Sequence, residues 1–167
     1  MLNDDFADLQ PCQPQSDEQK TDTFLDLLAG GFENDADLDV VRDAALQHLL
    51  QFPRLPDRTI EIMLAILADE DESDLVLNRK MAAIDVLARI GQQAKPAFAT
   101  LIDLLPLVGS DRDIERWLAL RAARAIWKIT GDNQPAAEVA SQLVVDEEAW
   151  LRIHAAELLG EIPAGGG

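Results

Sequence analysis

The sequence predicts an all-α fold in which a two-helix unit recurs about four times to form a right-handed α-α superhelix. Four stretches align at offsets of 38, 40 and 32 residues, and they begin at Arg42, Lys80, Leu120 and Arg152. Self-similarity at such periods is typical of stacked helical solenoids. Composition agrees: 5% of the 167 residues are aromatic, none is Tyr, and Ala, Leu, Ile and Asp are abundant, which favours helices over sheets.

Each aligned stretch has the same internal order of side chains. A pair of small or apolar residues stands two and three positions after the first residue: Ala44–Ala45, Ala82–Ala83, Ala122–Ala123 and His154–Ala155. A large apolar residue follows at the seventh position, and a Pro or Gly ends the stretch. This order predicts one amphipathic helix, repeated in every unit, that packs closely through small side chains.

The first unit follows a segment of different composition. Residues 1–20 are polar and hold two prolines, so we expect a flexible acidic arm. Thr21 or Asp22 is expected to cap the first helix, which the Gly30–Gly31 pair ends. An acidic turn then leads into a second helix over residues 38–51.

The other three units repeat this outline of helix, acidic turn and helix. A capping Asp or a Pro near the first turn opens their first helices, because a first-turn N–H has no intrahelical partner; these residues are Asp57, Pro96 and Pro135. The second helices are expected over residues 75–90, 117–129 and 150–162. The four units define a repeat domain over residues 21–163, and residues 164–167 are expected to form a flexible Gly-rich tail.

The second helices carry a resemblance to a known family. Arg or Leu-Arg followed by an Ala pair recurs in segments 41–46, 120–132 and 151–162. These segments resemble the second helix of short HEAT-like repeats, of the type found in phycobiliprotein bilin lyases. The resemblance implies a stack of helical repeats over about residues 21–163. It implies no single activity, because many such proteins are adaptors or scaffolds.

Acidic residues dominate the charge of the chain, which is −17 at pH 7. Each turn between the two helices of a unit is acidic, and equivalent turns stack along one edge of a solenoid. We therefore predict an acidic edge that attracts a basic protein partner. The residues expected to bind it are Asp69, Glu70, Asp71, Glu72, Asp111, Asp113, Trp117, Glu147 and Trp150. A second interpretation stays open: such acids cap helices and favour solubility without any ligand.

Three tryptophans are assigned by position. Trp127 falls on the apolar seventh position and is expected in the core. Trp117 and Trp150 lie near the predicted acidic edge. We expect them to pack between adjoining turns, and the alternative is that they anchor a partner.

The basic residues of the third unit line one helical stripe. Arg121, Arg124 and Lys128 are three and four residues apart. We expect them to pair with acids of adjoining units, and a bound carboxylate or phosphate is the alternative. Nucleic-acid binding is not expected, since the net charge repels a phosphate backbone.

No catalytic or metal-binding pattern is evident in the sequence. His48 and His154 have no Cys, His or acid at a recognised metal-ligand spacing. The segment from Asp69 begins like a calcium loop, but Asp74 occupies the glycine position and Lys80 that of the bidentate acid. The sequence therefore predicts no catalytic residue, no metal and no cofactor.

Compartment and function follow as expectations. The single Cys12 has no disulfide partner, the first residues are acidic rather than basic, and no run approaches 20 apolar residues, so a cytoplasmic protein is expected. The expected function is non-catalytic protein–protein binding, as an adaptor, scaffold or inhibitor.

Three alternatives remain beside this function. The chain is small and acidic enough for a bacterial immunity protein that neutralises a basic toxin. The resemblance alone implies a bilin lyase-like or chaperone-like subunit acting on phycobiliproteins. A piece of a longer solenoid is the third alternative, and it would expose apolar helix faces and self-associate.

Overall fold

The computed structural model describes residues 15–30 and 36–163, and within these ranges it contains only helices. They are α1 (Asp17–Ala29), α2 (Ala36–Leu49), α3 (Arg58–Leu67), α4 (Asp74–Ile90), η1 (Gly91–Ala97), α5 (Phe98–Ile102), η2 (Leu105–Gly109), α6 (Asp113–Thr130), α7 (Gln134–Leu143) and α8 (Ala149–Glu161), where η denotes a 3-10 helix. The predicted all-α class is confirmed. None of the helices in these ranges has the length and apolar character needed to cross a bilayer.

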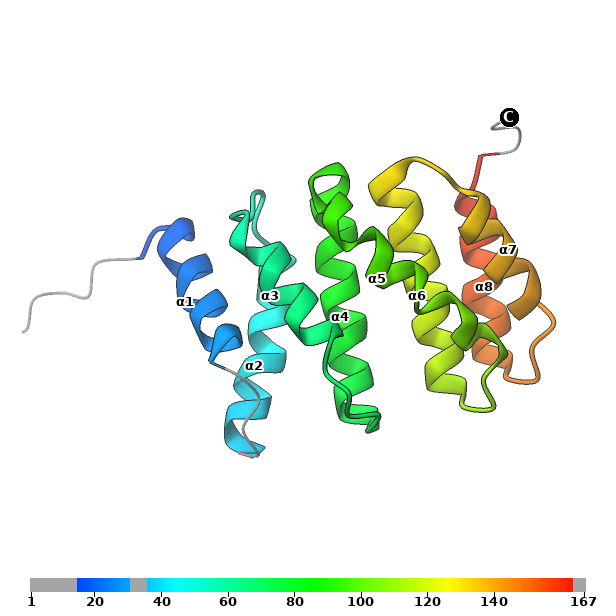
Figure 1. Cartoon of the computed structure of the whole chain (residues 1–167), viewed down its shortest axis with the longest axis horizontal. Helices are drawn as coiled ribbons and strands as arrows, with labels where there is room; N and C mark the ends of the chain where they lie inside the picture. Colours follow the sequence, from blue (N-terminus) through cyan, green and yellow to red (C-terminus); the bar gives the residue numbers. More distant parts are fainter. Residues whose placement is uncertain (1–14, 31–35, 164–167) are drawn as a thin grey trace, which may run out of the picture.

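The helices lie side by side along the long axis of the molecule, with α1 and α8 at opposite ends (Figure 1). α2, α4, α6 and α8 pack on one another in that order. α1, α3 and α7 each pack on the helix that follows them, and the segment from η1 to η2 packs on α6. Every described helix therefore packs on a neighbour close to it in the sequence.

The predicted second helices agree with the structure to within two residues, except α6. It begins at Asp113, four residues before the predicted start. Asp113 is thus a first-turn residue of a helix, and Arg112 occupies the N-cap without a capping side-chain bond.

The start of α1 corrects the predicted boundary of the N-terminal arm. The N–H of Gln19 donates to Ser16 Oγ at 3.2 Å, and the N–H of Ser16 donates to Gln19 Oε1 at 3.0 Å. This capping box starts the helix at Asp17, so the predicted cap at Thr21 or Asp22 is wrong. Residues 17–20 belong to α1 and not to an arm, whereas residues 1–14 and 164–167 lie outside the described residues.

The first helix expected in the third unit is divided into three short pieces. Pro96 lies inside η1, α5 spans only five residues, and Pro106 opens η2. Because proline lacks an N–H and clashes with the preceding turn, an uninterrupted helix cannot run through both sites. Asp57 also differs from expectation, since its side chain makes no capping bond to α3.

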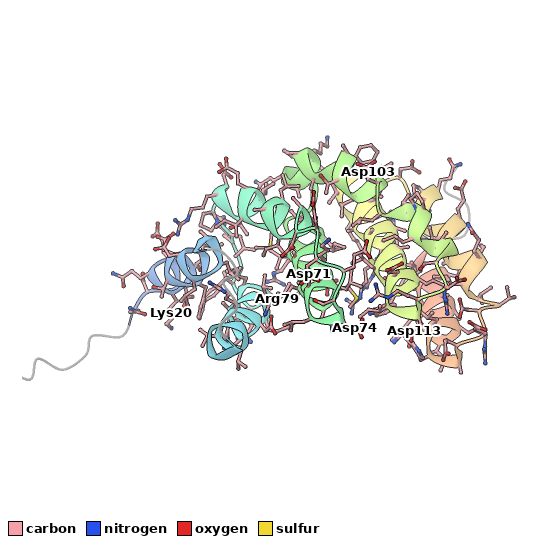
Figure 2. The ribbon with its side chains drawn as sticks, turned by 60° about the horizontal axis from the view of Figure 1, so that its bottom comes forward. Lys20, Asp71, Asp74, Arg79, Asp103 and Asp113 are labelled. Carbon is pink, nitrogen blue, oxygen red and sulfur yellow. The ribbon has the colours of Figure 1, made fainter. Side chains whose placement is uncertain are left out.

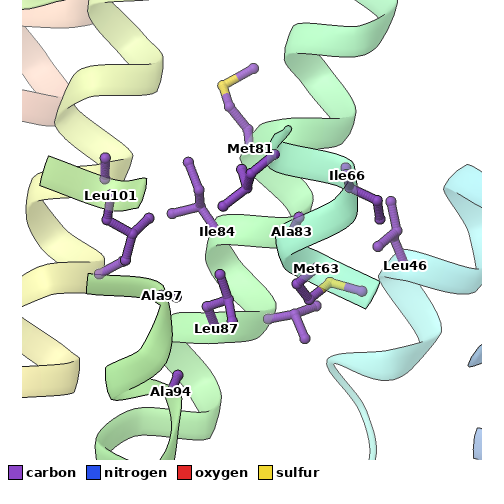
Figure 3. Close-up of a cluster of buried hydrophobic side chains, with 14 of the residues drawn as sticks. Leu46, Met63, Ile66, Met81, Ala83, Ile84, Leu87, Ala94, Ala97 and Leu101 are labelled. Atoms are coloured by element: carbon purple, nitrogen blue, oxygen red, sulfur yellow. The ribbon is translucent and has the colours of Figure 1, made fainter. Parts of the chain in front are cut away.

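The core confirms in part the predicted close packing of the repeated small residues, since Ala44 is exposed and His154 is half-buried. Ala45, Ala83, Ala123 and Ala155, the second members of the four pairs, are at most 1% exposed. Larger side chains such as Ile84 and Leu87 surround Ala83 in the core (Figure 3). Trp127 was predicted to lie in the core, but its side chain is only half-buried, in the last turn of α6. Lys128 Nζ lies 4.0 Å from the centre of its ring.

Candidate functional site

Three acidic turns lie along one edge of the molecule, the lower edge in Figure 1. They comprise residues 69–74 before α4, 111–115 around the start of α6 and 146–148 before α8, and they hold eleven acidic residues. We call this set the acidic edge. Figure 2 turns this side forward and labels Asp71, Asp74 and Asp113 on it. The structure thus brings the predicted acidic binding residues to one side of the molecule.

The first acidic turn is shaped by its own carboxylates. Asp69 Oδ1 accepts the N–H of Asp71 at 3.0 Å, and Asp71 Oδ1 accepts the N–H of Ser73 at 2.8 Å. The buried side chain of Lys80 donates its Nζ proton to the carbonyl of Asp69. Asp69 and Asp71 therefore have structural roles, as the capping interpretation expects.

Three other predicted binding residues have no such role. The side chains of Glu70, Glu72 and Asp111 are exposed, and none makes a hydrogen bond or ion pair within the part of the chain that the structure describes. Asp113, in the first turn of α6, differs from them because its Oδ1 accepts the N–H of Ile114 at 2.8 Å. The acidic edge thus holds both turn-forming carboxylates and carboxylates that face only solvent.

Arg112 joins the first two acidic turns. Its Nη2 donates to Asp74 Oδ1 at 2.8 Å and to the carbonyl of Glu72 at 3.0 Å, while its Nη1 donates to Glu115 Oε1 at 2.7 Å. Desolvation lowers the pKa of Arg112, but the hydrogen bonds to Asp74 and Glu115 outweigh it and leave the pKa above its ordinary value. The bridge therefore stays charged throughout the neutral range.

Arg116 joins the second and third turns. Its Nη2 donates to Asp146 Oδ1 at 3.2 Å, its Nε lies 2.9 Å from Asp146 Oδ2, and its Nη1 donates to the carbonyl of Ser110 at 2.9 Å. Glu147, a predicted binding residue, lies 3.7 Å from Arg116 and its side chain is 81% exposed. Arg152 donates to the carbonyls of Asp146 and Glu147 at 2.7 and 2.8 Å.

The sequence predicted no role for these arginines of the acidic edge. Arg112 and Arg116 meet carboxylates 38 and 30 residues away, which is close to the offsets between the aligned stretches. That spacing was a signal in the sequence. Which carboxylate each arginine meets depends on how one pair of helices is rotated against the next, and the sequence does not show this rotation.

The predicted tryptophans meet one another beside the third turn. The rings of Trp117 and Trp150 are 5.5 Å apart in an edge-to-face arrangement, and His154 lies 4.5 Å from Trp117. The guanidinium carbon of Arg121 lies 4.5 Å from the centre of the Trp117 ring. These tryptophans were expected to pack between adjoining turns; instead they pack against each other from the helices α6 and α8. Both are half-buried, so each also presents part of its ring to solvent.

A cleft of about 280 Å³ separates α6 from α8. The two arginines that line it are paired, because Arg121 Nη1 lies 2.6 Å from Asp85 Oδ2 and Arg124 Nη2 lies 2.9 Å from Glu161 Oε1. Lys128, the third residue of the basic stripe, has its Nζ 4.0 Å from Glu161 Oε2. The prediction that this basic stripe pairs with acids of neighbouring elements is confirmed.

The remaining candidates for chemistry are accounted for by packing. The His48 ring stacks on Phe24 at 5.3 Å, and His154 Nδ1 lies 2.9 Å from Glu157. No group of three His, Cys, Asp or Glu side chains suited to a metal ion occurs in residues 15–30 and 36–163. Cys12 lies outside these ranges.

Comparison of the chain with protein-family models, with curated proteins and with solved structures finds no match. Function is therefore inferred from the geometry of the acidic edge. What that arrangement provides is a fixed array of carboxylates with half-buried aromatic rings at one end.

Proposed function

We propose that the chain is a right-handed solenoid of four two-helix, HEAT-like units that binds a basic protein partner through its acidic edge, with no chemistry of its own. The repeat architecture is supported by ion pairs that join one unit to the next. Five arginines meet a carboxylate 32 to 38 residues away: Arg58 with Asp26, Arg79 with Asp43, Arg112 with Asp74, Arg121 with Asp85 and Arg124 with Glu161. These separations match the offsets of the aligned stretches.

The observation that carries the function is the set of solvent-facing carboxylates on the acidic edge. Lys80, Arg112, Arg116 and Arg152 use their donors on the turns themselves, so they fix the turns without occupying Glu70 or Glu72. Neither helix capping nor internal pairing accounts for these two exposed acids. Their field favours encounter with a positively charged surface.

The arginine bridges of the acidic edge lower the conformational-entropy cost of binding a partner. The two arginine bridges hold three turns at fixed spacings, so few backbone degrees of freedom would be lost on association. Trp117 and Trp150 lie at one end of the edge and add aromatic area, which often provides the dominant contacts of a protein interface. An immunity protein that neutralises a basic toxin would be one member of this class. For a lyase role no comparable set of unpaired side chains is found among the described residues at the α6–α8 cleft, where Arg121 and Arg124 are paired with Asp85 and Glu161.

The test is capture of partners from a native lysate with two matched variants. Glu70→Gln/Glu72→Gln removes two carboxylates from the acidic edge that have no structural bond, and Glu61→Gln/Asp103→Asn removes two exposed carboxylates elsewhere. We expect a basic protein that binds the wild type and the control at low salt and is lost from the edge variant. A partner retained equally by both variants would contradict the proposal.

A further inference from the structure

Apolar side chains accompany the carboxylates at each turn of the acidic edge. They are Leu75, Ile114 and Trp150, the second residues of α4, α6 and α8, and Val145 in the turn before α8. Figure 2 labels Asp74 and Asp113, which directly precede Leu75 and Ile114 in the chain. We call these four apolar residues the apolar row.

The apolar row leaves much of its surface in water. Leu75 is 44% exposed and Val145 is 80% exposed, while Ile114 and Trp150 are half-buried. Helix capping explains acids at the start of a helix, but it gives no reason for exposed apolar side chains beside them. Single exposed apolar residues are common on protein surfaces, whereas these recur in three consecutive turns. A partner that covers them gains the free energy of removing apolar surface from water.

We propose that the partner presents a basic amphipathic helix, which lies across the starts of α4, α6 and α8 and covers the apolar row. This inference rests on the proposed function and specifies the partner of the same site. Exposed carboxylates border the row at each turn, among them Glu72, Asp111 and Glu148. Lysine or arginine on both flanks of the bound helix would complement them, and apolar residues between the flanks would meet the row.

The spacing of the elements favours a helix over a β-strand as the bound segment. α4, α6 and α8 pack on one another in that order, and the axes of packed helices lie about 8–10 Å apart. Seven residues of an α-helix rise about 10.5 Å and return to nearly the same face. In a strand, a step of three residues spans about 10 Å but reverses the face. Apolar residues at every seventh position of a helix would therefore meet successive members of the apolar row.

Two synthetic peptides of about three heptads each test the inference. The ordered peptide has leucine at one position of every heptad, lysine on both flanks of that position and alanine elsewhere. The rearranged peptide has the same composition, with its leucines on different faces. We expect the ordered peptide to bind the full-length chain about tenfold more tightly at low salt, because it alone covers the apolar row. Fluorescence anisotropy of labelled peptides measures both affinities. Equal affinities would overturn the inference and leave the proposed function, which needs only charge, standing.

Matched variants and a third peptide complete the test. Leu75→Gln/Val145→Gln should remove the preference for the ordered peptide, whereas Phe98→Gln, at a residue of α5 that is 42% exposed, should preserve it. A preference that survives in the double variant, or is lost from both, would contradict contact at the apolar row. The third peptide keeps the order of leucines but has a central proline, which breaks a helix, and undiminished binding of it would overturn the inference. So would a lack of binding by every peptide, whereas the capture of partners from a lysate decides the proposed function separately.

Discussion

Arg116 and Asp146 form an ion pair that is almost fully withdrawn from solvent. The Nε–Oδ2 distance is 2.9 Å, and each side chain is 8% exposed. Because Arg116 also donates to the carbonyl of Ser110, one guanidinium holds two turns of the acidic edge. Removing Asp146 would leave the buried Arg116 charge with only the exposed Glu147, 3.7 Å away, so the stability of the fold should depend strongly on this pair.

Loss of this pair should destabilise the protein far more than loss of an exposed pair. We expect Asp146→Ala to lower the free energy of unfolding by about 3 kcal/mol, because the buried Arg116 charge then keeps only the exposed carboxylate of Glu147, 3.7 Å away. Glu161→Ala removes the exposed partner of Arg124, which is 45% exposed, and should cost at most about 1 kcal/mol. Urea unfolding followed by circular dichroism measures both. Similar small losses would show that Arg116 finds solvent or another partner.

The close helix crossing at the first small pair gives a second prediction. Ala45 is 1% exposed, whereas the adjacent Ala44 is exposed. Ala45→Leu should cost about 1–3 kcal/mol, because added methylenes force packed helices apart. Ala44→Leu should change the unfolding free energy by no more than about 0.5 kcal/mol. Thermal unfolding of the two variants tests the predicted asymmetry, and equal effects would mean that the crossing relaxes around position 45.

These adjacent alanines show what the sequence could and could not predict about the fold. The periodic small pairs predicted close packing through small side chains, because their spacing follows from local helix geometry, but they did not predict that Ala45 would be buried and Ala44 exposed. The start of α1 could have been predicted from the sequence, since Ser16 and Gln19 have capping-box spacing. The division of the helix around Pro96 and Pro106 was harder to predict, because proline is tolerated in a first turn and the sequence alone did not place that turn.

The candidate site was predictable in place but not in detail. Acidic residues in equivalent turns predicted that Asp71 and Asp113 would share one side of the molecule. The sequence could not separate Asp71, which shapes its turn, from Glu70, which faces solvent, because side-chain direction in a turn depends on its backbone angles. The role of Arg112 was missed since its partner Asp74 lies 38 residues away.

Arg112 should control local order in the first acidic turn. We expect Arg112→Gln to speed amide hydrogen exchange in residues 69–74, because the bridge to Asp74 and to the carbonyl of Glu72 is lost. The midpoint of global unfolding should hardly move, since the side chain of Arg112 is 39% exposed and that of Asp74 is 76% exposed. Exchange measured by mass spectrometry on wild type and variant tests this. Unchanged exchange in that turn would assign its order to Asp69 and Asp71 instead.

Two glycines should respond to alanine with opposite signs. Gly131 ends α6 with a φ of +82°, a conformation that costs a residue with a Cβ about 1 kcal/mol. Gly160 lies within α8, and a Cβ there would meet no atom within 4 Å. Gly131→Ala should therefore destabilise the protein, and Gly160→Ala should stabilise it by about 0.5 kcal/mol through helix propensity. Melting temperatures of the two variants provide the measurement, and a shift of the same sign in both would refute the assignment.

The most direct test of the acidic edge as a binding surface is hydrogen exchange on a complex with a captured partner. The account predicts new protection of backbone amides in residues 69–74, 110–116 and 146–150, and little change at residues 52–57 and 91–97 on the opposite edge. Protection that appears on the opposite edge or in the α6–α8 cleft, with the acidic turns unchanged, would contradict it.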